Sequence, residues 1–420
     1  MTSQVAVANL HGIAVASDTV VSQSSSEGMK TLENMSKIYT LGKNHKVVLV
    51  HSGNADINGV SHWLHLTEWI AQIKEPYSTL AEYVDSYLAW SNQTKPLHTE
   101  TSEMDLIHRL LNDHYYFIKN RADETLELEV ENLSQGETLS EVKIADVIYQ
   151  YSLEGLKYLE SLTDYGIFTL EQAEGILSSN SFDVVEKLEY IFKDFDLNKE
   201  LREVLLKSAP LVLLKHQEMN FVDSEIGFVG FGTDEPFGGI IHLHCRGYYG
   251  GKLHVFVEEK FGVAPVGIER GSQSIIRHFA QGDAIWAFIR GYNPRILSRA
   301  LGAVREKIEE YFGEKEWEFT DDSGEAKTKL TSELAYELAD EVYLEIRDKY
   351  SIENFSSPLL NSIESMSTIS LAAFAESLVG IQALSTYSQR GTATVGGLIE
   401  VVTIDRAEGV VWRQKIGSTK

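Results

Sequence analysis

The 420-residue sequence has one cysteine and seven prolines, and it has far fewer basic than acidic residues. Because Cys245 has no second cysteine to pair with, the fold cannot depend on an internal disulfide. The 62 Asp and Glu residues outnumber the 37 Lys and Arg residues, which gives a formal net charge of −25. This deficit of basic residues argues against partners rich in phosphate, namely nucleic acids and anionic membrane surfaces.

The sequence also lacks an early basic-plus-apolar signal, an apolar run near the length of a membrane span, a Gly/Ser-rich linker and an internal repeat. Together with the single cysteine, these absences favour a cytoplasmic protein without a membrane partner. Hydrophobic residues make up 43% of the chain, which is ample for a core. We expect one domain over residues 1–420, with helical insertions at about 55–219 and 273–385.

The most informative residue is Thr2, because removal of Met1 would leave it at the amino terminus. An N-terminal threonine carries a hydroxyl nucleophile and a free α-amine, and the amine can act as the base for the hydroxyl. An α-amine titrates at about 7.7–8.0, so a useful fraction of it is neutral near pH 7. A small residue after Met1 is common, so Thr2 alone is weak evidence.

Apolar runs after Thr2 predict a strand-rich region. Val5–Ala8 and Ile13–Ala16 flank a turn at His11-Gly12, which is the pattern of a β-hairpin. A later run, Val47–Val50, leads into Ser52-Gly53 before an expected long helix. Small residues at such a junction expose backbone N–H groups that can bind a developing oxyanion.

Thr2, the hairpin, Asp18, Lys37 and Ser52-Gly53 follow one another at the start of the chain. In these residues the chain resembles proteasome β subunits and their bacterial ATP-dependent relatives. Those proteins are N-terminal nucleophile (Ntn) hydrolases. The resemblance implies that Thr2 attacks the substrate and that Lys37 lowers the pKa of Thr2. It also implies that Asp18 holds Lys37 and that the N–H of Gly53 builds the oxyanion hole.

The spacing between Asp18 and Lys37 is slightly longer than in that family, and we expect an insertion at Ser22–Gly28. Lys30 is therefore a second candidate for the catalytic lysine. Lys37 is preferred because it begins an apolar strand, as the family lysine does.

Segments further along extend the resemblance to about half of the chain. Ile226–Gly232 and Ile240–His244 resemble the central strand pair of the family's second sheet, and residues 396–415 resemble its last strand pair. Gly271–Ser274 lies where the family has a Gly-Ser-Gly-Ser turn, so the resemblance implies the serine role for Ser272.

The chain departs from the family before the late glycine pair. Thr392 and Val395 replace the usual aspartate and serine, which help to orient the terminal amine. The segments Phe279–Asp283 and Thr394–Gly397 also resemble a set of uncharacterised bacterial proteins with a proteasome-like core.

The resemblance implies an α+β fold, a four-layer αββα Ntn-hydrolase sandwich in which two antiparallel sheets carry helices outside. Residues 224–270 are expected to be strands, and residues 273–385 to be helical. Apolar spacing of three and four predicts helices at Ile57–Ile73, Leu80–Trp90, Glu103–Ile118, Val142–Leu162, Val184–Phe195 and Leu201–Leu214.

The implied activity is hydrolysis of an amide bond, in a peptide or a small amide, through an acyl-enzyme on Thr2 and without a cofactor or metal. A homo-oligomer is the expected assembly, and the sequence does not identify an ATPase partner. The alternative is a catalytically inactive scaffold or regulatory subunit, because Asp18 and Lys37 would form a buried ion pair there as well.

Two histidine pairs have spacings that metal sites use, but packing is the simpler interpretation of both. His62 and His65 share one face of an expected helix, with no carboxylate nearby in the sequence. His242 and His244 alternate on an expected strand, so they share one face and Cys245 takes the other.

Overall fold

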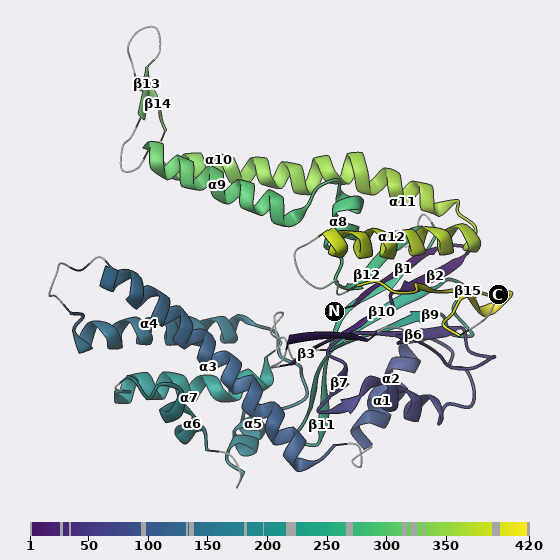
Figure 1. Cartoon of the computed structure of the whole chain (residues 1–420), viewed down its shortest axis with the longest axis horizontal. Helices are drawn as coiled ribbons and strands as arrows, with labels where there is room; N and C mark the ends of the chain where they lie inside the picture. Colours follow the sequence, from purple (N-terminus) through teal and green to yellow (C-terminus); the bar gives the residue numbers. More distant parts are fainter. Residues whose placement is uncertain are drawn as a thin grey trace.

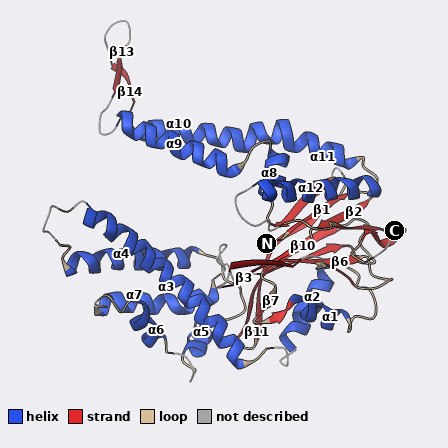
Figure 2. Cartoon of the chain, in the orientation of Figure 1, coloured by secondary structure: helices blue, strands red, loops and turns tan. Residues whose placement is uncertain are grey.

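The structure is a computed structural model. It describes residues 2–25, 28–32, 35–93, 98–131, 133, 138–179, 183–195, 197–215, 224–265, 272–312, 317–320, 326–330, 332–388 and 395–417. Within these ranges the chain combines helices with antiparallel sheets (Figure 2), which confirms the mixed α/β class expected from the sequence.

The first sheet is built around the amino-terminal hairpin. Its strands are β1 Ser3–Asn9, β2 Gly12–Ser17, β12 Ser274–Ala280, β15 Glu400–Asp405 and β16 Gly409–Gln414. Their order is β12-β1-β2-β15-β16, with antiparallel neighbours. The register pairs Ser3 with Ala280 and Asn9 with Ser274, so the two ends of β1 meet opposite ends of β12.

The second sheet consists of β5 Ile38–Thr40, β6 Val47–Gly53, β9 Ser224–Gly230, β10 Gly239–Tyr249 and β11 Lys252–Gly262. Their order is β11-β10-β9-β6-β5, again with antiparallel neighbours. Short hairpins lie outside the two sheets: β3 Val21–Ser25 with β4 Gly28–Leu32, β7 Asp56–Ile57 with β8 Val60–Ser61, and β13 Trp317–Thr320 with β14 Ala326–Leu330.

The two sheets enclose an apolar layer. Ala6 of β1 and Val50 of β6 belong to one buried cluster, whereas Val5 packs against helices on the outer face. Successive side chains of a strand point to opposite faces, so the shared cluster lies between the sheets. Gly227 leaves room in this layer, because a Cβ there would lie 2.6 Å from the ring of Phe279.

Helices cover the outer faces of both sheets (Figure 1). The first sheet carries α8 Asp283–Arg290, α11 Ser357–Glu364 and α12 Thr368–Ser388, and the second carries α1 His62–Ile70 and α2 Leu80–Gln93. Among the described helices, α12 is long and apolar enough to cross a membrane by length and composition, with a mean hydropathy of 1.3. Its contacts with β1, β2 and β15 are those of a core helix.

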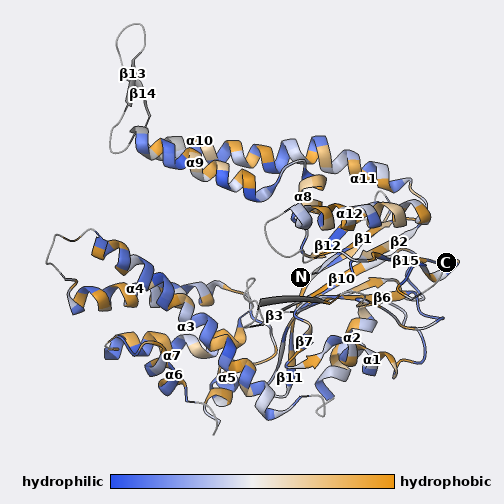
Figure 3. Cartoon of the chain, in the orientation of Figure 1, coloured by the Kyte–Doolittle hydropathy of each residue, from blue (hydrophilic) through white to orange (hydrophobic). Residues whose placement is uncertain are grey.

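Two helical extensions leave the sheets on the side where the amino terminus lies (Figure 1). The first comprises α3 Glu100–Glu131, α4 Glu141–Ser161, α5 Leu170–Leu177, α6 Val184–Ile191 and α7 Lys199–Leu214, and it has an apolar cluster of its own. The second comprises α9 Pro294–Phe312, α10 Ser332–Leu344 and the π-helical segments Glu345–Tyr350 and Ile352–Ser356. Hydrophobic residues run along the sheet strands and alternate with hydrophilic ones on the extensions (Figure 3).

The expectation that residues 273–385 are helical is wrong in two places. Ser274–Ala280 forms β12, and the charged stretch that follows α9 contains β13 and β14. Strand β12 alternates, with Ile275 and Phe279 in the layer between the sheets. Its partner β1 lies at the other end of the sequence, so no local hairpin signal marks it as a strand. The short helix α5, which begins with a capping box at Thr169, was also not predicted.

Candidate active site

Asp18 and Lys37 form a buried ion pair at one end of the two sheets. Lys37 Nζ lies 2.7 Å from Asp18 Oδ1 and donates to the Val20 carbonyl at 2.6 Å. Asp18 directly follows β2 of the first sheet and Lys37 directly precedes β5 of the second, so the pair joins the sheets. Burial lowers the pKa of the Lys37 ammonium, while the negative charge of Asp18 opposes that shift.

Backbone donors complete the environment of Asp18, whose side chain is 0% exposed. The Ser3 N–H donates to the same oxygen, Oδ1, at 2.9 Å. The N–H groups of Val20 and Gly396 donate to the other oxygen, each at 3.3 Å. A buried carboxylate persists when its lone pairs are satisfied in this way, and the shared oxygen keeps the Lys37 ammonium close to the backbone after Thr2.

Thr2 directly precedes β1 and is buried, with 8% of its surface exposed. Its carbonyl accepts a hydrogen bond from the Gln281 N–H at 3.0 Å. Next to it, the side-chain amide of Gln4 donates to the Lys37 carbonyl at 3.4 Å. Thr2 therefore lies at the end of the molecule where Asp18 and Lys37 meet.

Ser52 and Gly53 end strand β6 at the same end of the sheets. Ser52 is buried and Gly53 is exposed, with a φ of 78° that favours glycine. The Ser52 hydroxyl donates to Glu225 Oε2 at 2.7 Å, and the same oxygen accepts the Ala280 N–H at 3.1 Å. Since Ala280 pairs with Ser3, these bonds place the Ser52–Gly53 corner beside the start of β1.

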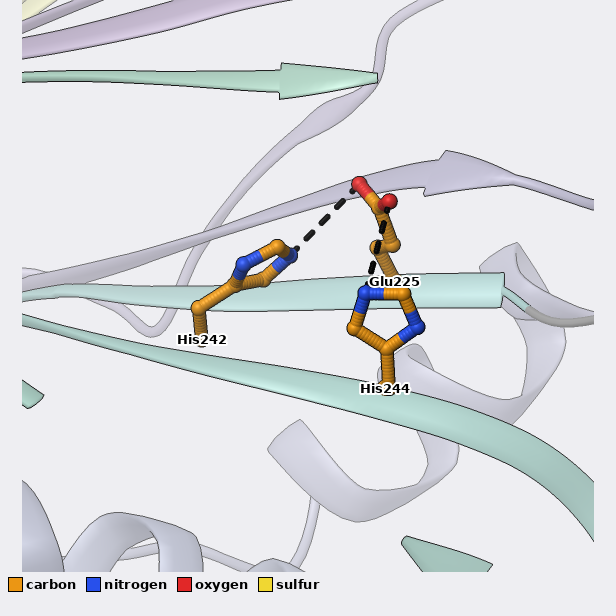
Figure 4. Close-up of side chains that lie close together, drawn as sticks. All are labelled: Glu225, His242 and His244. Carbon is orange, nitrogen blue, oxygen red and sulfur yellow. Dashed lines mark ion pairs between the residues drawn. The ribbon is translucent and has the colours of Figure 1, made fainter. Parts of the chain in front are cut away.

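The cluster around Glu225 is a feature that the sequence analysis missed. Glu225 on β9 lies opposite His244 on β10, and His242 is two residues along on the same face. Glu225 Oε2 lies 3.5 Å from His242 Nε2, and Oε1 lies 3.7 Å from His244 Nε2 (Figure 4). Burial raises the pKa of Glu225, but His242, Ser52 and His244 outweigh it and lower that pKa to about 2. The sequence favours packing as the simpler interpretation of the two histidines, and the pairing of β9 with β10 is what brings Glu225 beside them.

Ser272 is not brought together with the other candidates. Strand β12 runs antiparallel to β1, so Ser274 lies beside Asn9, seven residues along the chain from Thr2. At about 3.4 Å per residue, seven residues of extended strand separate Thr2 from Asn9 by roughly 24 Å. Ser272 instead donates to the Ser274 carbonyl at 2.7 Å and lines a pocket of about 310 Å³ together with residues of β12 and α8.

The remaining candidates are placed only in part. Val395 is buried, and the neighbouring Gly396 contacts Asp18 and accepts the Thr19 N–H at 3.2 Å. Thr392 lies outside the described residues, as does the side chain of Lys30. Cys245 packs on the outer face of the second sheet, opposite to the face of its histidine neighbours.

Comparisons with known proteins found little. No family model matches the chain, and no curated protein matches it. Among solved structures, Anbu (ancestral beta-subunit) from Yersinia bercovieri aligns over 87% of this chain and 97% of its own, with 9% identity and a TM-score of 0.20. An Anbu (Gly-1) mutant from Hyphomicrobium sp. strain MC1 aligns over 84% and 97%, with 9% identity and a TM-score of 0.19.

These comparisons correct the identification made from the sequence. The prediction that the chain is a member of the proteasome β-subunit-like family of Ntn hydrolases, or of the uncharacterised bacterial proteins with that core, is wrong. That prediction depended on motifs of a few residues each. The chain as a whole matches no family model. Any functional conclusion therefore depends on the geometry of the site.

Proposed function

We propose that the protein is an N-terminal-threonine hydrolase that cleaves an amide bond through an acyl-enzyme on Thr2. The observation that supports this most strongly is the shared oxygen of Asp18, which binds both the Ser3 N–H and the Lys37 ammonium. A buried cation held this close to the residue after Thr2 would stabilise a developing alkoxide on the Thr2 hydroxyl.

Each residue then has a definite role. The neutral α-amine of Thr2 takes the hydroxyl proton, and Thr2 Oγ attacks the substrate carbonyl. The Gly53 N–H at the end of β6 holds the oxyanion while Lys37 stabilises the alkoxide, and Asp18 orients Lys37. The amine proton passes to the leaving nitrogen, and water releases the acyl group and restores the hydroxyl. Ser272 has no part in this mechanism.

The proposal extends to the architecture. The layer between the sheets and the helices on both outer faces support a four-layer αββα arrangement. In this arrangement the two helical extensions, α3–α7 and α9–α10 with the π-helical segments that follow, are insertions on one domain. Exposed apolar residues on the extensions, such as Ile296 at 70% and Val142 at 71%, support a homo-oligomer with its interface there. Light scattering that gives a monomer mass at high concentration, in both low and high salt, would exclude this assembly.

The first test is substitution of the nucleophile. Thr2→Ala should reduce cleavage of a panel of fluorogenic peptide amides and small amides to background, while Thr2→Ser keeps measurable activity because it retains hydroxyl and amine. Circular dichroism should show the same fold in both variants, since Thr2 lies at the end of a strand. Unchanged hydrolysis by Thr2→Ala would contradict the mechanism.

The second candidate function is an inactive scaffold subunit. Buried Val395 supports it, because an apolar side chain in the loop that contacts Asp18 cannot orient an amine by hydrogen bonding. The ion pair of Asp18 and Lys37 would then serve only to join the sheets. This function requires a blocked Thr2 amine or an amine that does not react.

A further inference from the structure

The Thr2 end of the layer between the sheets has a second polar bridge, centred on Glu225. The Ser52 hydroxyl reaches Glu225 Oε2 from β6, within the same sheet, and the Ala280 N–H reaches it from β12 of the other sheet. Ser52 leads into the proposed oxyanion donor Gly53, and Ala280 pairs with Ser3. One oxygen of Glu225 thus connects the end of β6 in the second sheet with the end of β12 in the first sheet, on either side of the proposed site.

Two histidines lie next to the Glu225 carboxylate, and an arginine contacts one of them. His242 is buried and its Nε2 faces Glu225 Oε2, while His244 faces Oε1. Arg277 of β12 lies 2.8 Å from His242 Nδ1. Because a guanidinium can only donate, His242 Nδ1 accepts this bond, and the proton of a neutral His242 is on Nε2, directed at Glu225.

This proton placement decides between two interpretations of the cluster. The ligand atoms of Glu225, His242 and His244 lie within 4.8 Å of one another, a donor set that could hold a metal ion. A metal at His242 Nε2, however, needs the lone pair that the proton occupies. Glu225 Oε2 is also occupied by the bonds from Ser52 and Ala280. The hydrogen bonds therefore favour a protein-only bridge over a metal centre.

We propose that Glu225 is a positioning residue that fixes the Ser52–Gly53 corner against the start of β1. This inference rests on the proposed function of Thr2 and adds a residue to it. The bridge mirrors that of Asp18 and Lys37: one lies between β2 and β5, and the other between β12 and β9, with β1 between them in the first sheet. Glu225 acts through its charge and its bonds to Ser52 and Ala280, and it does not contact the scissile bond.

The test uses Glu225→Gln, which keeps the size and one acceptor oxygen but removes the charge. We expect kcat to fall about 10- to 100-fold with little change in KM, the loss typical of weakened oxyanion stabilisation. Ser52→Ala removes one bond of the bridge and should lower kcat less. Ser272→Ala is the control outside the site.

A pH profile separates positioning from a general loss of structure. Several charged or titratable groups of the described residues lie around the two bridges: Asp18, Lys37, His51, His242, His244, Arg277 and Glu400. Glu225 lies near the start of β1, because its Oε2 accepts the N–H of Ala280, which pairs with Ser3. Removal of this negative charge should lower the pKa of the Thr2 amine, which sets the acidic limb of kcat/KM, by roughly a few tenths of a unit. Glu225→Asp should restore this limb, because it restores the charge.

The outcomes are distinguishable from failure of the proposed function. Wild-type rates and pH profiles in Glu225→Gln, with Thr2→Ala inactive, would overturn the positioning role and leave the nucleophile intact. Activity in Thr2→Ala would overturn both. Titration of the metal-free protein with Co²⁺ must give no spectrum of a bound ion. A stoichiometric spectrum lost in His244→Ala would show a metal site in place of the bridge.

Discussion

The two ends of strand β1 use polar residues in different ways. At the Thr2 end, two buried or half-buried carboxylates dominate: Asp18 pairs with Lys37, and Glu225 lies beside His242 and His244. At the other end, Asn9 donates at 2.8 Å to the carbonyl of Ile363, in the last turn of α11, and at 2.8 Å to that of Met366, which follows the helix.

These bonds at the Asn9 end are neutral and short-range. They satisfy carbonyls that a helix end leaves without partners, which is a structural function. A buried charge, in contrast, is costly to desolvate and adds little net stability. The difference indicates that the Thr2 end is where the fold retains a costly arrangement, as expected of a reactive site.

Lys37→Met should produce the largest difference between the two ends. It leaves Asp18 charged and buried without its cation, which costs on the order of 3–5 kcal/mol of the free energy of unfolding. Activity should fall to background, because the stabilising charge beside Thr2 is lost. Urea unfolding and amide hydrolysis measure the two effects. Lys30→Ala is the control and should change neither the free energy of unfolding nor the rate of hydrolysis. If Lys30→Ala lowers both, Lys30 and not Lys37 is the lysine of the site.

Between pH 8 and pH 5, acid should weaken the fold through buried histidines such as His65 and His98, and not through Glu225, whose carboxyl titrates below this range. Burial lowers the pKa of His65 to about 3 and that of His98 to about 4, while the pKa of Glu225 is lowered to about 2. A histidine with a lowered folded pKa is neutral in both states above pH ~6.5. Below that pH the unfolded chain binds protons that the folded chain refuses, so stability is lost as pH falls toward 3–4.

The expected cost at pH 5 is about 2 kcal/mol for His65 alone. Urea midpoints measured between pH 8 and pH 5 test this sign and size. His65→Leu should flatten the dependence on pH, even if it is less stable at neutral pH. A midpoint that stays constant down to pH 5 would contradict the buried, neutral state of these histidines.

Ser272→Ala should give the smallest effect. Ser272 is exposed, and the substitution removes the hydroxyl bond to the Ser274 carbonyl while leaving its backbone bond with Ala264 in place. The free energy of unfolding should therefore change by about 0.5 kcal/mol or less. Hydrolysis should remain at the wild-type rate. A loss of activity without a loss of stability would show that the Asn9 end takes part in the reaction, and the contrast between the two ends would then fail.

Local patterns in the sequence predicted the local parts of this structure. Two apolar runs and the turn at His11-Gly12 between them predicted the hairpin of β1 and β2, and the run before Ser52 predicted β6. Asp18 directly follows β2 and Lys37 directly precedes the strand β5 that it was expected to begin, and the structure brings the two together.

Features that depend on pairing of distant strands could not be predicted. Ser272 was assigned to the site from a short motif, but the direction of β12 beside β1 sets it at the other end. Glu225 joins His242 only because β9 and β10 pair, and no spacing within the sequence reports that register. The family prediction was wrong for a related reason. It depended on short motifs, which contain no information on how the chain between them folds.

The most direct test of the central claim is the intact mass of the purified protein, with and without a peptide epoxyketone. This electrophile closes a ring that needs both the hydroxyl and the free α-amine of one residue. We predict a chain that begins at Thr2 and gains one adduct, mapped to Thr2 and absent in Thr2→Ala. Retained Met1, or an unblocked Thr2 that gains no adduct, would contradict an N-terminal-threonine nucleophile and favour the scaffold.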